Sequence, residues 1–163
     1  MTAEPAVAAV VRALVERRQT LAVAESLTGG LLAATLVEIP GVSAVFRGGV
    51  VVYATDLKHT LAGVPQRLLD ERGPVDPDVA LALAAGVRER CGSDWGLATT
   101  GVAGPDPQDG KPVGTVYVAV AGPGGQAVRA LSLAGSRSDI RSASVLSALS
   151  LLAAELPGRP GES

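Results

Sequence analysis

The sequence predicts a single α/β domain with helices on both faces of a mixed sheet. Short apolar runs rich in Val and Ala alternate with segments of helical periodicity along most of the 163 residues, a pattern that favours strands joined by helices. A Gly-Pro-Gly-Gly turn at 122–125 joins two late apolar runs, which indicates a hairpin and therefore antiparallel strands. No internal repeat and no linker divides the chain.

The first half of the chain supplies an amphipathic helix and then strands alternating with helices. Apolar residues recur at helical spacing at Val7, Val10, Val11, Leu14 and Val15, and charged residues 16–18 close this first helix. The elements predicted next are a buried strand at 21–25, a helix over 29–39, a strand near 47–54, and short helices over 55–62 and 65–72.

The second half begins with a helix whose start and end are well marked. Asp76 is the predicted N-cap, Pro77 takes the first helical position and Gly92 ends the helix. The elements predicted after it are a strand at 94–101, a Gly/Pro/Asp loop at 102–113, the hairpin within 114–135, and a helix over 136–156. We expect one domain over residues 1–157 and a disordered tail over 158–163.

Composition excludes several classes of protein. The formal net charge is −2 and only four residues are aromatic, so a nucleic-acid partner, which needs basic grooves and stacking platforms, is not expected. The single Cys91 cannot form an internal disulfide, which favours a reducing compartment. The chain carries no signal-peptide pattern and no uncharged apolar run near the roughly 20 residues that span a bilayer. We therefore expect a soluble cytoplasmic protein without a membrane partner.

The residues available for catalysis are few. One His and one Cys cannot build the usual zinc site, and neither phosphate-loop nor dinucleotide glycine motifs are present, so no metal and no cofactor are expected. His59 is interpreted as a surface residue of a short polar helix. What remains is serine chemistry with a lysine base. Only Lys58 and Lys111 are available, and Lys58 lies five residues after Tyr53, whose hydroxyl could relay a proton or orient the amine.

Two serines are candidate nucleophiles. Ser26 lies at a strand-to-helix turn, where unpaired helix amides could hold a phosphate or a developing oxyanion, although Ser26 or Thr28 could equally cap the helix. Ser43 is the second candidate, and its alternative role is to cap a short helical turn. Ligands of such folds gather beyond the carboxyl ends of strands, where the glycine-rich loops after Glu25 and Thr99 are expected.

Four motifs, in order and at matching spacing, resemble one bacterial family. They are "AESLTGGLLAATL" (24–36), "GVSAVFRGGVVVYATDLK" (41–58), "TTGVAGPD" (99–106) and "KPVGTVYVAV" (111–120). Over about residues 5–155 the chain is similar to the C-terminal domain of competence/damage-inducible protein A (CinA), in the stand-alone form known as nicotinamide-nucleotide amidohydrolase. The resemblance implies a three-layer α/β/α sandwich. It also implies hydrolysis of the carboxamide of nicotinamide mononucleotide, giving nicotinate mononucleotide and ammonia without a metal.

Carried onto this chain, the resemblance gives a set of site residues. The catalytic candidates are Ser26, Ser43, Tyr53 and Lys58. The substrate-binding candidates are Thr28, Gly29, Gly30, Thr100, Gly101, Gly104 and Arg137. We hypothesise that Ser26 attacks the carboxamide, that neutral Lys58 accepts its proton, and that amides at the start of the 29–39 helix stabilise the oxyanion. The competing assignment makes Ser43 the nucleophile and Ser26 an orienting or oxyanion group.

The substrate suggests roles for the binding residues. Arg137, at the start of the last helix, suits the 5′-phosphate, unless it is only an exposed helix-cap residue. Thr100 and the loop after it could wrap the ribose or phosphate, and the Gly29-Gly30 pair would keep the backbone open beside the substrate. Either Glu25 or Asp106 could face the positive charge of the pyridinium ring, although Glu25 also suits the first turn of a helix.

The chain departs from the family pattern at two places. Leu27 stands where the family usually has Cys, which is interpreted as packing. Asp76 replaces a Ser in the family's Gly-Ala-Val-Ser segment, which leaves open an amide substrate other than nicotinamide mononucleotide. A non-catalytic nucleotide-binding module is the alternative of a different class. The sequence does not define the oligomeric state, and a homodimer is only the default expectation for a small enzyme.

Overall fold

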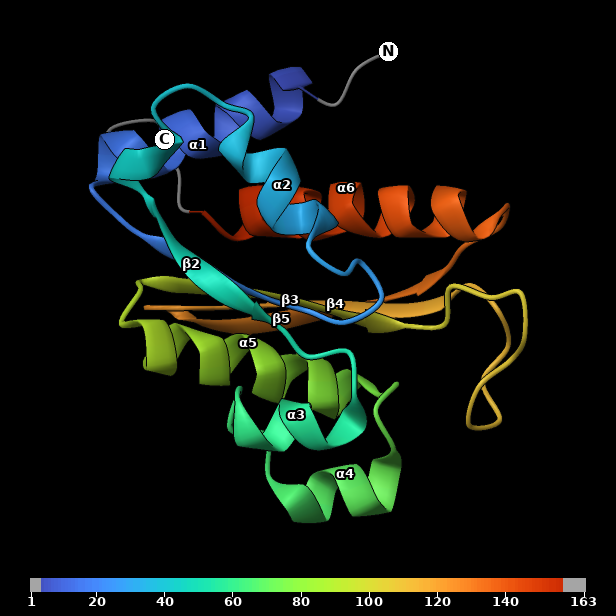
Figure 1. Cartoon of the computed structure of the whole chain (residues 1–163). Coiled ribbons are helices and arrows are strands. Elements are labelled where there is room, and N and C mark those ends of the chain that lie inside the picture. The colour runs from blue at the N-terminus through green and yellow to red at the C-terminus, as the bar shows by residue number, and fades with distance from the viewer. Residues whose placement is uncertain (1–3, 157–163) are drawn as a thin grey trace.

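Helices cover both faces of a five-stranded sheet in the computed structural model, which describes residues 4–156 (Figure 1). The strands are β1 (Leu21–Glu25), β2 (Phe46–Val51), β3 (Trp95–Gly101), β4 (Thr115–Gly122) and β5 (Gly125–Ser132). The helices are α1 (Glu4–Arg17), α2 (Leu31–Val37), α3 (Thr55–Thr60), α4 (Gln66–Arg72), α5 (Pro77–Cys91) and α6 (Arg137–Glu155), with a 3-10 turn η1 at Val42–Ala44. The predicted single α/β domain with a mixed sheet is confirmed, while the predicted tail at 158–163 lies outside the described residues.

The sheet order is β2-β1-β3-β4-β5. β1 pairs in parallel with β2 on one side and β3 on the other, whereas β4 and β5 join antiparallel, as the hairpin signal predicts. In register, Glu25 at the end of β1 lies between Val51 of β2 and Thr99 of β3. The carboxyl ends of three parallel strands therefore meet at one edge of the sheet, where ligands of such folds bind.

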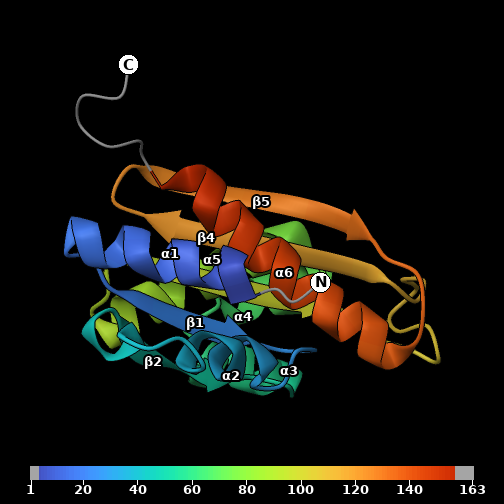
Figure 2. The same ribbon diagram turned by 90° about the horizontal axis from the view of Figure 1, so that it is seen from above.

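Each face of the sheet has its own apolar core. Figure 1 shows α1, α2 and α6 on one face and α3, α4 and α5 on the other, and Figure 2 shows α1 and α6 side by side over the sheet. Alternation along β1 divides its residues between the two cores. Leu21 and Val23 belong to the core beneath α1, α2 and α6, while Ala22 and Ala24 belong to the core against α5.

Small residues let α5 approach the sheet closely. A Cβ atom at Gly96 of β3 would lie 2.0 Å from the carbonyl oxygen of Ala84 in α5, and one at Gly86 would lie 1.7 Å from the carbonyl oxygen of Ala62. Neither approach is compatible with a side chain, so both glycines are required by packing. This packing fixes α5 against the sheet on one side and against the segment after α3 on the other.

The element boundaries differ from the predictions at a few positions. The helix predicted at 29–39 spans Leu31–Val37, because Gly29 and Gly30 adopt φ values of +57° and +105°, outside the right-handed helical region. The strand predicted at 47–54 ends at Val51. The predicted cap is confirmed: the Asp76 carboxylate accepts from the amides of Asp78 and Val79. Within residues 4–156, no helix combines the length and apolarity needed to cross a bilayer.

Candidate active site

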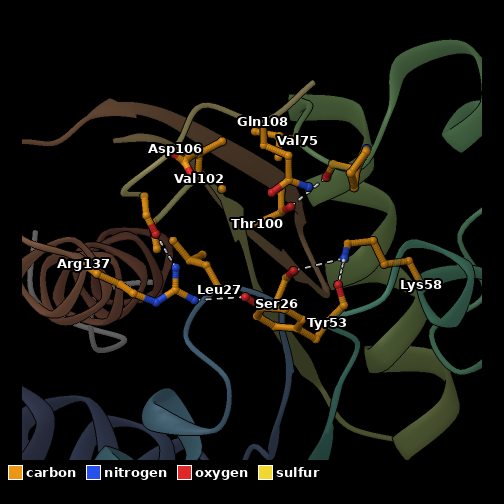
Figure 3. Close-up of a pocket in the computed structure, with 14 residues that line it drawn as sticks. Ser26, Leu27, Tyr53, Lys58, Val75, Thr100, Val102, Asp106, Gln108 and Arg137 are labelled. Carbon is orange, nitrogen blue, oxygen red and sulfur yellow. Dashed lines mark hydrogen bonds between the residues drawn. The ribbon is translucent and has the colours of Figure 1, made fainter. Parts of the chain in front are cut away.

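A cleft of about 520 Å³, solvent-filled mouth included, opens at the carboxyl edge of the parallel strands (Figure 3). Its lining comes from segments far apart in the sequence: the turn after β1, the segment from β2 into α3, the entry to α5, the loop after β3, and the start of α6. The lining residues are Ser26, Leu27, Tyr53, Lys58, Pro74, Val75, Thr100, Gly101, Val102, Ala103, Gly104, Asp106, Gln108 and Arg137. Seven of the predicted site residues therefore line one cleft: Ser26, Tyr53, Lys58, Thr100, Gly101, Gly104 and Arg137.

A buried polar contact in the cleft joins Lys58 to Ser26. The Nζ atom of Lys58 lies 3.0 Å from Ser26 Oγ, and it donates to the backbone carbonyls of Val52 at 2.7 Å and Tyr53 at 3.5 Å. Lys58 is only 1% exposed and Ser26 8% exposed. Burial disfavours the charged amine and lowers the pKa of Lys58 from 10.5 to about 8.

The contacts of Lys58 favour one direction of proton transfer. A neutral amine has two N–H groups and one lone pair. The two carbonyl oxygens can only accept, so they take the two N–H groups. The lone pair is then left for Ser26, the one neighbour of Nζ that has a proton to give. This geometry suits a serine nucleophile with an adjacent base.

The side chain of Tyr53 does not orient the amine of Lys58, contrary to one sequence-based hypothesis. The Tyr53 side chain is exposed, and its hydroxyl accepts a hydrogen bond from Arg137 Nη2 at 3.0 Å. Lys58 is instead held by the main chain of residues 52 and 53. Sequence alone could not show this, because any residue type at 53 supplies the same carbonyl.

Arg137 lies at the mouth of the cleft, at the first position of α6. The helix start is fixed by a capping box in which Ser136 and Asp139 exchange side chain-to-backbone hydrogen bonds. From there the guanidinium donates to the carbonyl of Gly104 and to the hydroxyl of Tyr53. Arg137 thus links three lining segments at the N-terminal end of a 19-residue helix.

Thr100 and the glycines after it shape the wall formed by β3 and its loop. The Thr100 hydroxyl donates to the carbonyl of Pro74 at 2.7 Å, which ties the entry of α5 to β3. Gly101 has no room for a side chain, since a Cβ there would lie 2.7 Å from the carbonyl oxygen of Thr115. Gly104 has φ of +84°, which favours glycine.

The turn after Ser26 is held from within the fold. The buried Glu25 carboxylate accepts from the amides of Leu32 at 2.7 Å and Ala33 at 3.0 Å. These are the amides at the start of α2 that the sequence-based hypothesis assigned to the oxyanion, so that assignment is corrected. Glu25 faces the helix and is absent from the lining of the cleft, as its alternative interpretation as a first-turn helix carboxylate predicts.

Thr28, Gly29 and Gly30 also lie outside the lining. The hydroxyl of Thr28 is fully buried and lies 2.8 Å from that of Thr99, which in turn accepts from the amide of Ser26 at 3.4 Å. Thr28 therefore supports Ser26 and does not cap α2. The two glycines permit the left-handed backbone of the turn and do not border the cleft, which corrects the expectation that they lie beside the substrate.

Arg141 is a residue that the sequence analysis missed. Its Nε donates to the carbonyl of Leu27 and its Nη2 to the carbonyl of Thr28, both at 3.0 Å. It thereby clamps the turn that carries Ser26 onto α6. A signal was available, because Arg141 follows Arg137 by four residues and so lies on the same face of the predicted last helix.

Ser43 lies far from the cleft, which corrects its assignment as a nucleophile or a partner of Ser26. It is exposed in η1, before the start of β2, whereas Ser26 follows the end of β1. Because β1 and β2 are parallel, with Leu21 paired to Phe46, the two serines lie at opposite edges of the sheet. At about 3.3 Å per residue, a five-residue strand separates these edges by about 16 Å.

The two departures from the family pattern are explained by packing and capping. Leu27 is buried in the core on the α2 side. Asp76 caps α5 as the family serine could, and it is absent from the lining of the cleft. Among residues 4–156, no group of three or more His, Cys, Asp or Glu side chains lies together as metal ligands would.

The fold and the cleft together define an α/β domain with a buried serine–lysine pair at the carboxyl edge of its parallel strands. Residues 3–156 match the CinA C-terminal domain. The chain belongs to this family, and the resemblance recognised from the four sequence motifs is confirmed.

Individual relatives agree with this assignment. A CinA-like protein of Frankia casuarinae is 54% identical over 147 residues, covering 90% of this chain and 34% of that protein. A putative competence-damage inducible protein of Desulforamulus reducens is 46% identical over 146 residues, covering 90% of this chain and 36% of that protein. The chain thus spans about a third of the length of the curated relatives it matches.

Solved structures share the fold. The crystal structure of the competence/damage inducible protein CihA from Agrobacterium tumefaciens superposes with a TM-score of 0.89 at 34% identity, covering 93% of each chain. That of the competence damage-inducible protein A (ComA) from Klebsiella pneumoniae gives a TM-score of 0.93 at 30% identity, covering 98% of this chain and all of that one. The three-layer arrangement implied by the resemblance is therefore the fold of this chain.

Proposed function

We propose that the protein hydrolyses the carboxamide of nicotinamide mononucleotide to nicotinate mononucleotide and ammonia. The observation that carries this proposal is the 3.0 Å contact between Lys58 Nζ and Ser26 Oγ, buried in a cleft with Arg137 at its mouth. Amide hydrolysis needs a nucleophile, a base that becomes an acid, and a way to hold the substrate. The cleft offers candidates for each.

In the first half of the reaction, Ser26 Oγ attacks the carboxamide carbon while Lys58 Nζ accepts the serine proton. The resulting tetrahedral intermediate carries a negative oxygen. Its candidate donor is the amide of Leu27, which follows the nucleophile directly and lines the cleft with it. Within residues 4–156 that amide has no hydrogen-bond acceptor. The hydrogen bond from Arg141 to the carbonyl of Leu27 fixes the turn that presents the Leu27 amide.

In the second half, the C–N bond breaks and ammonia leaves with the proton held by Lys58. Ser26 is then an ester of the nicotinoyl group. Water attacks this ester while the neutral Lys58 accepts a proton from it, and the return of that proton to Ser26 Oγ regenerates the pair. Each proton that Lys58 takes up is delivered within the same half-reaction, so no other acid or base is required.

The 5′-phosphate is assigned to Arg137. Two guanidinium nitrogens of Arg137 already donate to neutral oxygens, those of Gly104 and Tyr53. An anionic phosphate is a stronger acceptor than either. With the phosphate at the mouth and the carboxamide at the buried serine–lysine pair, the ribose and the pyridinium ring would occupy the part of the cleft between them.

The test is to incubate the purified protein with nicotinamide mononucleotide and measure ammonia and nicotinate mononucleotide together. Ser26→Ala should lower the rate by at least about a thousandfold while the protein stays folded. Ser43→Ala is the matched control, since Ser43 lies at the opposite edge of the sheet, and it should retain activity. A folded parent that yields neither product would overturn the proposal. An inactive Ser43→Ala protein with an active Ser26→Ala protein would overturn the assignment of the nucleophile.

A further inference from the structure

Asp106 is the one carboxylate among the residues that line the cleft, where the two basic side chains are Lys58 and Arg137. Both basic side chains are engaged: Lys58 with Ser26 and two carbonyls, Arg137 with Gly104 and Tyr53. Asp106, by contrast, has no hydrogen-bond or ion-pair partner within residues 4–156. Asp106 therefore lines the cleft with a carboxylate that neither basic side chain of the cleft neutralises.

The charges of the cleft are separated in space. Figure 3 shows Asp106 and Lys58 on opposite sides of the view, with Ser26 between them. Asp106 lies two residues after Gly104, and the carbonyl of Gly104 accepts a hydrogen bond from Arg137. The carboxylate of Asp106 nevertheless forms no ion pair with Arg137. The cleft therefore presents an amine beside the nucleophile, a cation at the mouth, and an unpaired anion on the wall formed by the 102–113 loop.

We infer that Asp106 is a specificity-determining residue that selects amides attached to a cationic aromatic ring and turns that ring away from Lys58. This inference rests on the proposed function. When the carboxamide carbon lies against Ser26 Oγ, the ring attached to it must point either toward the Lys58 side or toward the Asp106 side. A ring that carries positive charge is attracted by the Asp106 side and gains nothing from Lys58, whose amine is neutral when it accepts the serine proton. An uncharged ring gains nothing from either.

The position of Asp106 suits a selective contact. It lies on an exposed loop at the wall of the cleft, so part of its attraction is screened by solvent. At about 5 Å and an effective dielectric constant between about 40 and 80, one carboxylate strengthens the binding of a cation by about fourfold to fifteenfold. That range is large enough to measure and small enough to let the product leave.

The experiment compares two ligands that differ in ring charge. Nicotinamide mononucleotide carries a pyridinium, whereas its reduced 1,4-dihydropyridine form has an uncharged ring and the same amide, ribose and phosphate. Calorimetric dissociation constants are measured on Ser26→Ala protein, which holds the substrate without turnover. The same measurements are made with Asp106→Asn added. Asp109→Asn is the matched control, because Asp109 carries the same charge on the same loop but is absent from the lining.

Asp106→Asn is expected to weaken binding of the oxidised nucleotide by about fourfold to fifteenfold and to leave binding of the reduced nucleotide unchanged. Asp109→Asn is expected to change the binding of neither ligand. Asp106→Glu, which keeps the negative charge, is expected to retain most of the preference for the oxidised nucleotide. Equal weakening of both ligands, or no weakening of either, would overturn the role of Asp106 while the hydrolysis assay on the parent still stands. A parent that neither hydrolyses the oxidised nucleotide nor binds it would overturn the proposed function and this inference with it.

Discussion

Raising the pH through the titration range of Lys58 should stabilise the folded protein, and Lys58→Met should remove that gain. Burial lowers the pKa of Lys58 from 10.5 to about 8 in the folded state, whereas the unfolded chain restores the ordinary value. Between these two pH values the unfolded chain holds a proton that the folded protein has released. The free energy of unfolding therefore rises with pH across this window.

The size of the effect follows from the difference between the two pKa values. A fall from 10.5 to about 8, at about 1.4 kcal/mol for each pH unit, amounts to about 3 kcal/mol. Below pH 8 both states are protonated and Lys58 contributes no slope, while the buried ammonium costs its full amount. As the pH rises from 8 to 10.5, this cost is relieved in the folded state and the gain approaches its full value.

The assay is urea unfolding of the parent and the Lys58→Met protein at a series of pH values from 7 to 10. The difference between the two curves isolates Lys58, because every other group titrates in both proteins. Lys111→Met is the matched control. It removes the only other lysine, which lies on the 102–113 loop, and its curve should run parallel to that of the parent.

Curves for the parent and Lys58→Met that stay parallel from pH 7 to 10 would refute the reasoning. They would mean that the amine keeps its ordinary pKa in the fold, and the role of Lys58 as a base near neutral pH would lose its physical basis. The measurement needs no substrate, so it tests the buried amine independently of the proposed reaction.

Two further predictions follow from the same contacts. Hydrolysis of nicotinamide mononucleotide, followed as kcat/KM, should rise about fivefold between pH 7 and pH 8, because the neutral fraction of an amine with a pKa of about 8 grows from about a tenth to a half. It should rise by about another twofold before it levels off above about pH 9. A profile flat between pH 7 and pH 8 would contradict the assignment of Lys58 as the base. Glu25→Gln should destabilise the fold by about 1–3 kcal/mol in urea unfolding, since one of the two α2 amides that the carboxylate holds would face an NH₂ group, whereas Glu38→Gln, an exposed carboxylate change at the other end of α2, should leave stability within about 0.5 kcal/mol.

Local sequence signals were sufficient for most of the secondary structure. Periodicity gave α1, Pro and Gly gave the limits of α5, and the Gly-Pro-Gly-Gly turn gave the β4–β5 hairpin. The signals failed at the start of α2. Gly29 and Gly30 directly precede the apolar run and were predicted to be helical, but their positive φ values place the first helical residue at Leu31. Glycine adopts positive and negative φ values about equally readily, so the residue type alone does not predict which one it takes.

The candidate site divides in the same way. Elimination by composition left serine chemistry with one of two lysines, and the family resemblance pointed to Lys58. The expected position of ligands beyond the carboxyl ends of the strands predicted the edge where the site would lie. Which serine meets the lysine depends on the strand direction of β2, since that direction places Ser43 at the far edge and Lys58 beside Ser26.

The amino-acid order alone was enough to predict the available residue types, most of the elements and the edge of the sheet that carries the site, because these depend on side-chain chemistry and on patterns within a few residues. Only the tertiary structure decided which groups meet. The Glu25 carboxylate accepts from the α2 amides, and main-chain carbonyls hold Lys58. Arg141 donates to the carbonyl of Thr28, a residue 113 positions earlier in the chain. These contacts join segments that are distant along the chain, and their formation depends on how the layers pack, which no local pattern encodes.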